Sequence, residues 1–579
     1  MELELRERCV RSARAASLPC LRATMEFIVE SFRPYHESSI WRLHDSYYAT
    51  SGALAWTSGE VPYVATSSYS MARQHARTLV GLVEELTAGG MLGPSEEVWV
   101  LEVGGGLGSF ASHLLAALGA DCGRSGVRLR DRLRFVLSDY SRKSVADAIA
   151  VGPLVEATAS GLVIPALLDL ARPLDIRRLD GGAVSRPFTA VFANYVCCAL
   201  PPRIIRKTRA GFDEKLVCIG VKAEEDDDLV AAERRWREVL AAPARPKGAG
   251  ALSLAFGWRR TDLAQALGDP LHERVFRDLV DPFDEATVTY PQIFLDFARA
   301  ASARMITGAV LFVSDYGSAR AIDLRGLGQA PVTRYGGSVA HGVNFALFEA
   351  FCRHAGLSLL RTRDPLLSVH RAAIRYGRPV TPELAAAFRR GHVRDGRGQV
   401  LIDIRLSAAA LAKAGDHKTA VRLYRRGLRF DPDSAELYFR LGESCSKAGL
   451  DTLAIRYLLR GRRLDLRKQY AFDFALGRCY LRLGRLESAR RTLRRALRSG
   501  ASPRIWLELG RVHERLGDPR RARLCYRRTL ALAPKEEELS LAACRRLAAL
   551  PSAGGRGQGG AGRSRQPPRP THTREPSGA

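Results

Sequence analysis

The sequence predicts an α/β fold followed by an all-α array of helix pairs, and three observations carry this prediction. The short apolar run 98–103 is followed by a glycine-rich turn. After this turn, apolar residues recur every three to four positions, as in a helix. Further apolar runs of strand length recur between helical segments as far as about residue 375. Towards the C-terminus, glycines recur at intervals of 34, 35 and 33 residues, at positions 415, 449, 484 and 517.

The composition is that of a large globular protein with an excess of basic residues. The chain has 579 residues, a formal net charge of +28 and 46% hydrophobic residues, which together predict two or three domains. Basic surfaces attract nucleic acid, anionic membranes or acidic proteins, so the charge alone leaves the partner open. No apolar run reaches membrane-spanning length, and the N-terminus mixes acids and bases without the apolar core of a secretory signal.

The cysteine pattern indicates whether the protein is found in a reducing or an oxidising compartment. The chain has 11 of them, scattered and without a Cys-x-x-Cys pair, and Cys197 and Cys198 are adjacent in an apolar run. This pattern favours small buried thiols in a reducing environment over a disulfide framework or a zinc site. We therefore expect a cytoplasmic protein with no membrane segment and no metal centre.

The glycine-rich turn has the residue pattern of a nucleotide-binding loop. Gly104 and Gly106 fit the spacing of a dinucleotide loop, but Ser109 stands where the third glycine belongs, and Gly108 comes one position early. Glu102 precedes the first glycine by two residues, and its charge suits a ligand with ammonium and sulfonium groups better than a pyrophosphate. The pattern resembles the first motif of class I S-adenosylmethionine (SAM) methyltransferases. A turn of this kind can also join a strand to a helix without any ligand.

Acidic residues end the strands that we expect to follow this loop. The second strand, 133–139, ends at Asp139, where a carboxylate can accept both hydroxyls of a ribose or can cap the next helix. A third strand within 162–168 precedes Asp169, which we place near the adenine amino group of a nucleoside ligand. Because ligands gather at the carboxyl ends of parallel strands, we expect both acids to lie at one site.

Two later strands end at the expected reacting side of that site. The fourth strand ends in Asn194 and is followed by Tyr195, and both would face the transferred methyl group. A fifth strand ends in Asp315, which we assign to the same place. Between these strands, residues 222–300 interrupt the alternation and begin with an acidic run, so we expect an inserted helical lid or substrate segment.

The C-terminal glycines belong to a repeat with several fixed positions. A small residue precedes each glycine by seven positions, an alanine follows by five, and an aromatic residue or leucine follows by nine. The positions are Ala408, Gly442, Gly477 and Gly510, then Ala420, Ala454, Ala489 and Ala522, then Tyr424, Leu458, Leu493 and Tyr526. This is the tetratricopeptide repeat pattern, in which small residues let two helices approach closely. It predicts four helix pairs and a capping helix over 535–550, stacked into a short solenoid with a concave face.

The repeats carry most of the net positive charge. Residues 401–550 have a net charge of roughly +18. We therefore expect the concave face to bind an acidic protein or peptide. Nucleic acid is the less favoured partner, because the basic residues lack interleaved aromatic side chains on which bases could stack.

Six segments of the first 375 residues match one known family. In chain order they are Tyr47-Tyr48, Glu102 to Gly108, Ser138 to Ser141, Ala193 to Pro201, Asp315-Tyr316-Gly317 and His341 to Phe345. They resemble the MidA-like SAM-dependent methyltransferases, which include an enzyme that methylates protein arginine. Two acids of the family's motifs are replaced here by Tyr195 and Cys198. A guanidinium prefers bidentate carboxylates, so the resemblance implies SAM binding well and arginine as the substrate only poorly.

These observations lead us to expect a SAM-dependent methyltransferase with a Rossmann-like class I sheet, whose repeats recruit a protein or peptide. The residues expected to bind the cofactor are Glu102, Gly104, Gly106, Gly108, Asp139 and Asp169, and those expected at the reacting end are Asn194, Tyr195 and Asp315. One alternative is a non-catalytic scaffold built on a degenerate methyltransferase fold. A second is nucleic-acid methylation, although the Asn/Asp-Pro-Pro-aromatic signature is absent because Tyr195 follows Asn194.

The expected domain order follows from these assignments. It comprises a helical N-terminal region (1–95), the first part of the methyltransferase core (96–221), the inserted segment (222–300), the second part of the core (301–380), a linker (381–400), the repeats (401–550) and a disordered Gly/Arg/Pro tail (551–579).

Overall fold

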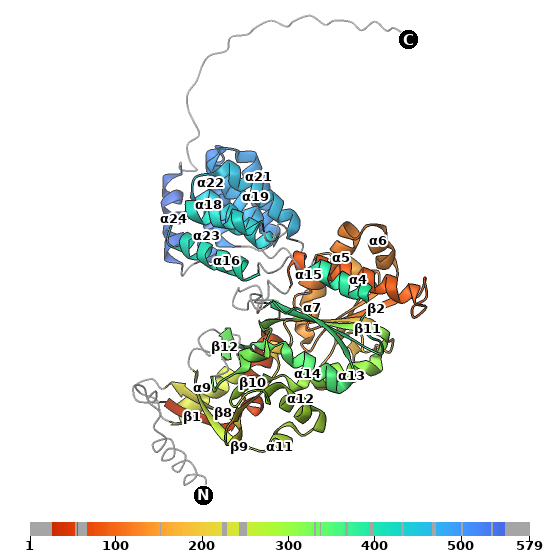
Figure 1. Cartoon of the computed structure of the whole chain (residues 1–579). Helices are drawn as coiled ribbons and strands as arrows, with labels where there is room; N and C mark the ends of the chain where they lie inside the picture. The colour runs from red at the N-terminus through yellow and green to blue at the C-terminus, as the bar shows by residue number, and fades with distance from the viewer. Residues whose placement is uncertain are drawn as a thin grey trace, which may run out of the picture. The chain divides into compact units, whose positions relative to one another are not determined.

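The computed structural model divides the chain into two compact units, residues 1–472 and 473–579 (Figure 1). It describes residues 26–52, 55, 67–150, 152–222, 229–241, 252–328, 332–335, 337–364, 369–392, 398–429, 434–465, 471–499, 502–533 and 536–550. The expected acidic run 224–228, the prolines that close two repeats and the expected tail 551–579 lie outside these residues. Within the described residues, no helix is long and apolar enough to cross a membrane.

Nine strands form the main sheet, in the order β15-β16-β11-β6-β2-β3-β4-β5, with β14 paired to β11. Their bounds are β2 (Val98–Val103), β3 (Leu133–Asp139), β4 (Val163–Leu167), β5 (Arg177–Arg178), β6 (Phe188–Asn194), β11 (Met305–Ser318), β14 (Val343–Asn344), β15 (Ser358–Arg361) and β16 (Val369–Arg375). Strands β2, β3, β4, β6 and β11 are parallel, whereas β16 is antiparallel to both of its neighbours. This order confirms the predicted α/β fold with a Rossmann-like class I methyltransferase sheet.

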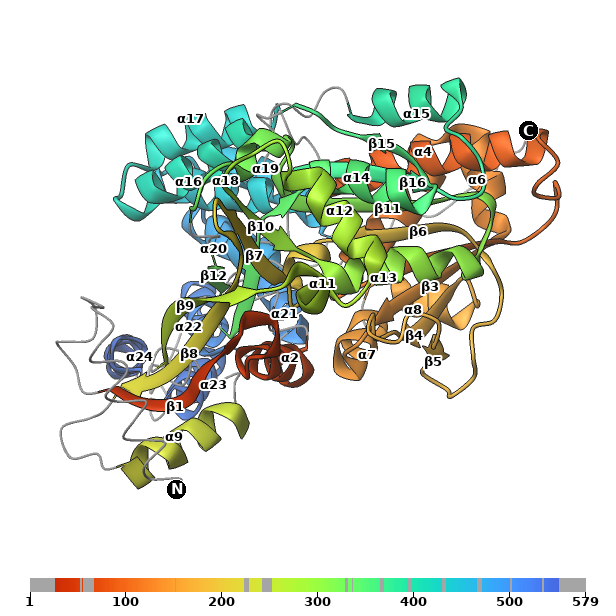
Figure 2. The same ribbon diagram turned by 60° about the horizontal axis from the view of Figure 1, so that its bottom comes forward.

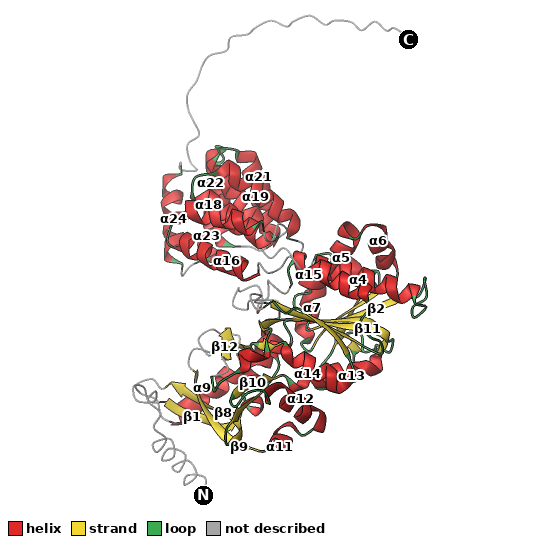
Figure 3. Cartoon of the chain, viewed as in Figure 1, coloured by secondary structure: helices red, strands yellow, loops and turns green. Residues whose placement is uncertain are grey.

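Helices cover both faces of this sheet (Figure 3). On one face lie α4 (Tyr69–Ala88), α5 (Ser109–Asp121) and α15 (Pro382–His392), whose apolar residues pack on Phe192 and Phe312. On the other lie α12 (Pro270–Val280), α13 (Gln292–Ala301) and α14 (Ala346–Ala355). Between α5 and β4, the chain forms three further helices, α6 (Gly123–Asp131), α7 (Arg142–Ile149) and α8 (Leu154–Ala159). Burial on both faces explains why the central strands are apolar along their whole length.

A second sheet of five strands corrects the expectation for the N-terminal region and for 222–300. It contains β1 (Glu26–Pro34), β7 (Arg203–Thr208), β8 (Gly211–Lys222), β9 (Leu252–Thr261) and β10 (Ala286–Tyr290), all antiparallel to their neighbours (Figure 2). The interpretation of 222–300 as a helical segment was therefore wrong in part, although α9 (Leu229–Ala241) and α11 (Leu263–Leu267) lie within it. The strands form because remote partners supply their hydrogen bonds, which local periodicity does not reveal.

The segment expected as a linker begins with a packed helix. Helix α15 lies on α4, and Leu384 and Phe388 are buried there. The buried guanidinium of Arg375 donates to Glu85 Oε1 at 2.5 Å, and Thr381 Oγ1 donates to Glu85 Oε2 at 2.8 Å. These bonds join the last strand of the sheet to α4 and to the start of α15.

The C-terminal helices form pairs, as the repeat predicted. They are α16 (Gly398–Lys413), α17 (His417–Gly427), α18 (Ala435–Lys447), α19 (Asp451–Leu464), α20 (Phe472–Arg482), α21 (Leu486–Ser499), α22 (Pro503–Arg515), α23 (Pro519–Leu532) and the expected capping helix α24 (Glu537–Ala549). The four recurrent turn glycines have φ values of 88°, 78°, 73° and 72°, in the left-handed region that favours glycine. A Cβ on Gly477 or Gly510 would lie 2.6 or 2.4 Å from the side chain of Leu493 or Tyr526. The small residues therefore let paired helices touch.

Candidate functional site

The glycine loop connects β2 to α5 through backbone conformations that favour glycine. Gly104, Gly106 and Gly108 have φ values of 65°, 50° and 65°, which side chains with a Cβ rarely adopt. The backbone N–H of Gly105 donates to Ser138 O at 2.8 Å, and Ser138 Oγ donates to Glu102 O at 2.6 Å. The loop is thus fixed to the end of β3, and Glu102 is buried at the end of β2.

Asp139 joins the second strand to the glycine loop. Its Oδ2 accepts the backbone N–H of Gly106 at 3.1 Å, and its Oδ1 accepts that of Ser141 at 2.9 Å. Burial raises the pKa of Asp139 to about 6, although N–H groups of Ser141, Gly106 and Tyr140 oppose this rise by favouring the carboxylate. The sequence-predicted acid and glycine loop therefore meet at one point.

Asn194 is the least satisfied polar group at the end of β6. Its side chain is 7% exposed, and neither Oδ1 nor Nδ2 has a hydrogen-bond partner among the described residues. A buried amide that lacks partners is unfavourable by roughly 1–3 kcal/mol, so Asn194 is a candidate for contact with a bound molecule.

Tyr195 follows in a strained backbone conformation. Its φ of 60° is the only positive value for a non-glycine residue in the part of the chain that the structure describes. Its backbone N–H donates to Ser314 O at 2.8 Å, and its ring meets that of Tyr316 edge-on with centroids 5.4 Å apart. Such strain is concentrated at binding and catalytic sites, where surrounding contacts hold it in place.

Asp315 holds the turn that follows these two residues. The fully buried carboxylate accepts the backbone N–H of Cys198 at 3.0 Å through Oδ2 and that of Tyr316 at 2.8 Å through Oδ1. Burial raises the pKa of Asp315 to about 6. These bonds make Asp315 a positioning residue for the segment Asn194–Cys198, while direct contact with a substrate stays a prediction.

Asp169 lies at the exposed edge of the expected site. Its Oδ1 accepts the backbone N–H of Ala171 at 2.9 Å, which forms a local turn. Desolvation, followed by the negative charge of Asp169, raises the pKa of Asp45 to about 6, so an acid from helix α2 (Ile40–Ser51) is close by. The predicted contact of Asp169 with an adenine amino group stays a prediction.

Helix α2 adds residues that the sequence reasoning missed. Tyr48 is buried, its hydroxyl donates to Ser338 Oγ at 3.0 Å, and its carbonyl accepts Ser141 Oγ at 3.4 Å. Tyr48 is also within electrostatic range of Asp139 and Cys198. Tyr48 therefore lies close to residues from two of the strand ends, Asp139 and Cys198. The adjacent tyrosines 47 and 48 were visible only as part of the family resemblance, which assigned no role to them.

A separate acidic cluster is bridged by an arginine. Asp269, His272 and Asp296 offer atoms within 4.8 Å of one another, a spacing that could hold a metal ion. Arg299 donates to Asp269 Oδ2 at 2.7 Å and to Asp296 Oδ1 at 3.0 Å, and His272 also contacts Tyr290 Oη at 2.8 Å. The Arg299 guanidinium thus bridges both carboxylates and occupies their oxygens, so we assign no function to this cluster.

Comparisons with known proteins identify the C-terminal part of the chain. Two tetratricopeptide repeat family models match residues 404–444 and 474–537. The C-terminal segment carries tetratricopeptide repeats. Among solved structures, the chain is similar to the MamA protein, with 23% identity, 26% of this chain and 79% of that chain covered, and a TM-score of 0.23. It is also similar to YrrB, described as a tetratricopeptide protein with an unusual peptide-binding site, with 16% identity, 28% and 80% coverage, and a TM-score of 0.23.

The α/β part is similar to a second group of structures. One is a COG1565 superfamily member from Burkholderia thailandensis, described as a methyl transferase candidate and bound to S-adenosyl-homocysteine. It shares 17% identity, covers 66% of this chain and 95% of its own, and gives a TM-score of 0.38. No curated protein matches the chain. Because this TM-score is below 0.5, we classify the main sheet by the order of its strands and not by this similarity.

Proposed function

We propose that the protein is a SAM-dependent methyltransferase that acts on a protein or peptide recruited by its repeats. The observation that carries the proposal is the hydrogen bond from the Gly106 N–H to Asp139, which places a glycine loop and a buried acid side by side at the carboxyl ends of two parallel strands. When bound, the cofactor supplies an electrophilic methyl group on a sulfonium. Every other component of the reaction would come from this chain and its substrate.

The residues around the loop fit this cofactor in their chemistry. Gly104, Gly106 and Gly108 would allow its methionine part to approach the backbone, and the buried carboxylate of Glu102 would face its ammonium group. Asp139 would accept the ribose hydroxyls through lone pairs that its two N–H partners leave available. Asp169 would contact the adenine amino group.

Asn194 would hold the methyl acceptor. Its Oδ1 can accept a hydrogen bond from the acceptor and its Nδ2 can donate one, so the amide can fix the direction of the nucleophile. The ring of Tyr195 would cover the same side, and Asp315 would keep both residues in place through its bonds to the following turn. Methyl transfer depends chiefly on this alignment, and holding two reactants in line is worth about 7–11 kcal/mol in favourable cases.

The acceptor is expected to be a group other than a protein arginine. Tyr195 and Cys198 stand where the resembling family has acids, and Cys198 is buried with a pKa raised well above its usual range by burial. A neutral thiol and a phenol cannot form the bidentate pair that a guanidinium prefers. We also propose that the protein is cytoplasmic, on the basis of its cysteine pattern.

Two experiments test this proposal together. Calorimetry measures the binding of SAM, and mass spectrometry of lysate treated with labelled SAM shows which molecules receive the methyl group. We expect SAM to bind with micromolar affinity or better and the label to enter a protein. The variant Asn194→Ala should keep SAM affinity and lose most transfer, because the amide is placed at the acceptor rather than at the cofactor. Absence of SAM binding would favour the scaffold alternative, and label in RNA or DNA would favour nucleic-acid methylation.

A further inference from the structure

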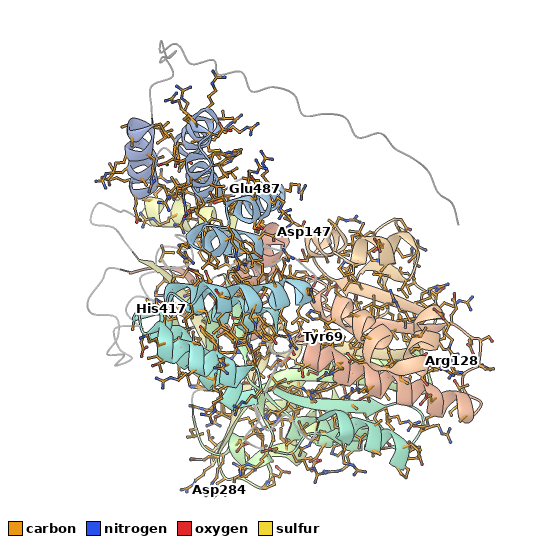
Figure 4. All side chains as sticks on the ribbon, turned by 90° about the horizontal axis from the view of Figure 1, so that it is seen from above. Tyr69, Arg128, Asp147, Asp284, His417 and Glu487 are labelled. Atoms are coloured by element: carbon orange, nitrogen blue, oxygen red, sulfur yellow. The ribbon has the colours of Figure 1, made fainter. Side chains whose placement is uncertain are left out.

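The second helices of the last two repeats form a strongly basic surface, which we call the arginine face. It consists of the exposed arginines Arg491, Arg494, Arg495 and Arg498 on α21 and Arg520, Arg521, Arg527 and Arg528 on α23. Helix α23 has no acidic residue, and Glu487 is the only one on α21. Figure 4 shows many nitrogen-tipped side chains over these helices, where Glu487 is labelled.

Few of these guanidinium groups form an ion pair with a residue that the structure describes, although Asp518 lies within electrostatic range of Arg520 as well as of Arg521. Arg495 pairs with Asp473 at 2.8 Å, and Arg521 pairs with Asp518 at 3.3 Å. The other six arginines of the face form no ion pair with any residue that the structure describes. Repulsion among like charges at positions i and i+4 destabilises a helix by a few tenths of a kcal/mol per pair, so a ligand that neutralises them would stabilise the repeats.

A buried histidine lies at the base of this surface. His513 of α22 is 2% exposed, and its Nδ1 has no hydrogen-bond partner among the described residues. Burial lowers the pKa of His513, the positive charges of Arg494, Arg521 and Arg490 lower it further, and only Asp518 opposes them. Arginines from α21 and α23 therefore lie within electrostatic range of one neutral imidazole.

An apolar residue lies within the arginine face. Leu524 is 58% exposed and shares one side of α23 with the arginines that precede and follow it by three or four positions, Arg520, Arg521, Arg527 and Arg528. The exposed positions of α21 and α23 hold no aromatic side chain. The face can thus bind carboxylates and an apolar side chain, but it offers no platform for stacking bases.

We propose that the arginine face, centred on Arg494, Arg521 and His513, binds a carboxylate-rich protein segment that also presents apolar side chains. Arginines four residues apart on a helix are separated by about 6 Å along its axis, close to the roughly 6.6 Å between alternate residues of an extended peptide. Carboxylates would pair with the guanidinium groups, and a leucine would pack on Leu524. This inference specifies the partner in the proposed function and is independent of methyl transfer.

Fluorescence anisotropy with the full-length protein tests the proposal in the absence of SAM. The probe is a labelled peptide of repeated Glu-Glu-Leu units, and its counterpart has Gln in place of Glu. We expect only the acidic peptide to bind, and the double variant Arg494→Gln/Arg521→Gln to weaken it at least about tenfold. The matched control Arg504→Gln removes an exposed arginine outside the face, on α22, and should leave affinity unchanged.

A second measurement separates binding at this site from a general effect of charge. Carboxylates that neutralise Arg494 and Arg521 should raise the pKa of His513, observed by NMR and assigned with His513→Gln. An unchanged pKa on peptide binding, or equal weakening by Arg504→Gln, would overturn the proposal. So would tighter binding of duplex DNA or RNA than of the peptide at physiological salt, with a steep loss as salt rises.

Discussion

Glycine serves different purposes in the two regions of this molecule. In the α/β part, three glycines of one loop have positive φ, and one of them, Gly106, donates its N–H to Asp139, which is remote in sequence. In the repeats, Gly477 and Gly510 make room for the helix that follows them within the same repeat. The first arrangement depends on contacts between distant segments, the second on contacts between neighbours in the chain. Substitutions should therefore have different consequences in each region.

The largest effect, a loss of stability, is expected from a larger side chain at the contact between two paired helices. Gly510→Val should destabilise residues 473–550 by about 3 kcal/mol, because even a Cβ there would lie 2.4 Å from the Tyr526 ring. Chemical denaturation followed by circular dichroism measures this loss, and SAM affinity should not change. Gly517→Asn is the matched control, since Gly517 has a φ of 72° with no heavy atom within 4 Å of a Cβ there, and asparagine tolerates that conformation. Equal destabilisation by both substitutions would contradict the packing role.

The same type of substitution in the loop should act on binding rather than on the fold. Gly106→Val places a branched side chain in a backbone region with φ of 50°, beside the N–H that Asp139 accepts. We expect at least about tenfold weaker SAM binding, or ~1.4 kcal/mol, by calorimetry. A normal SAM affinity in the variant would remove the loop from the cofactor site.

Acidification should weaken cofactor binding by a similar amount. The pKa of Asp139 is raised from its usual 3.8 to about 6, and ribose hydroxyls donate to the ionised form. Affinity should therefore fall about tenfold between pH 7 and pH 5. The free energy of unfolding of the ligand-free protein should instead rise on acidification through Asp139. Because its pKa is higher in the folded state, protonation favours that state as pH falls from about 6 towards 4.

The variant Asp139→Asn separates this group from its neighbours. It should bind SAM more weakly at pH 7 and lose the pH dependence between pH 5 and 7. If the dependence persists, another acid such as Asp315, whose pKa is also about 6, is responsible.

The smallest effect is expected on SAM affinity when the repeats are removed. A chain that ends at residue 397 retains α15 and its contacts with α4, and it should bind SAM as the full chain does, because solenoid repeats contact mainly their neighbours. A chain that ends before Thr381 should be less stable, since it loses the bond from Thr381 to Glu85. Loss of SAM binding in the longer form would contradict two separate modules.

The sequence predicted features whose determinants are close together in the chain. Strand β2, the glycine loop and Asp139 were readable from local apolar runs and turn residues, and the repeats from positions fixed over about 34 residues. The five-stranded sheet was missed because β1 pairs with β8, almost 190 residues away. Helix α15 was missed because its burial depends on α4, and the place of Tyr48 in the site depends on contacts with Ser141 and Ser338.

The backbone of Tyr195 implies a limit on how stable this protein can become. A non-glycine residue in the left-handed region is disfavoured by about 1–2 kcal/mol, and glycine would relieve that cost. Glycine would also remove the ring that packs against Tyr316. At this one peptide unit, the side chain that follows Asn194 is therefore present at the expense of some stability of the fold.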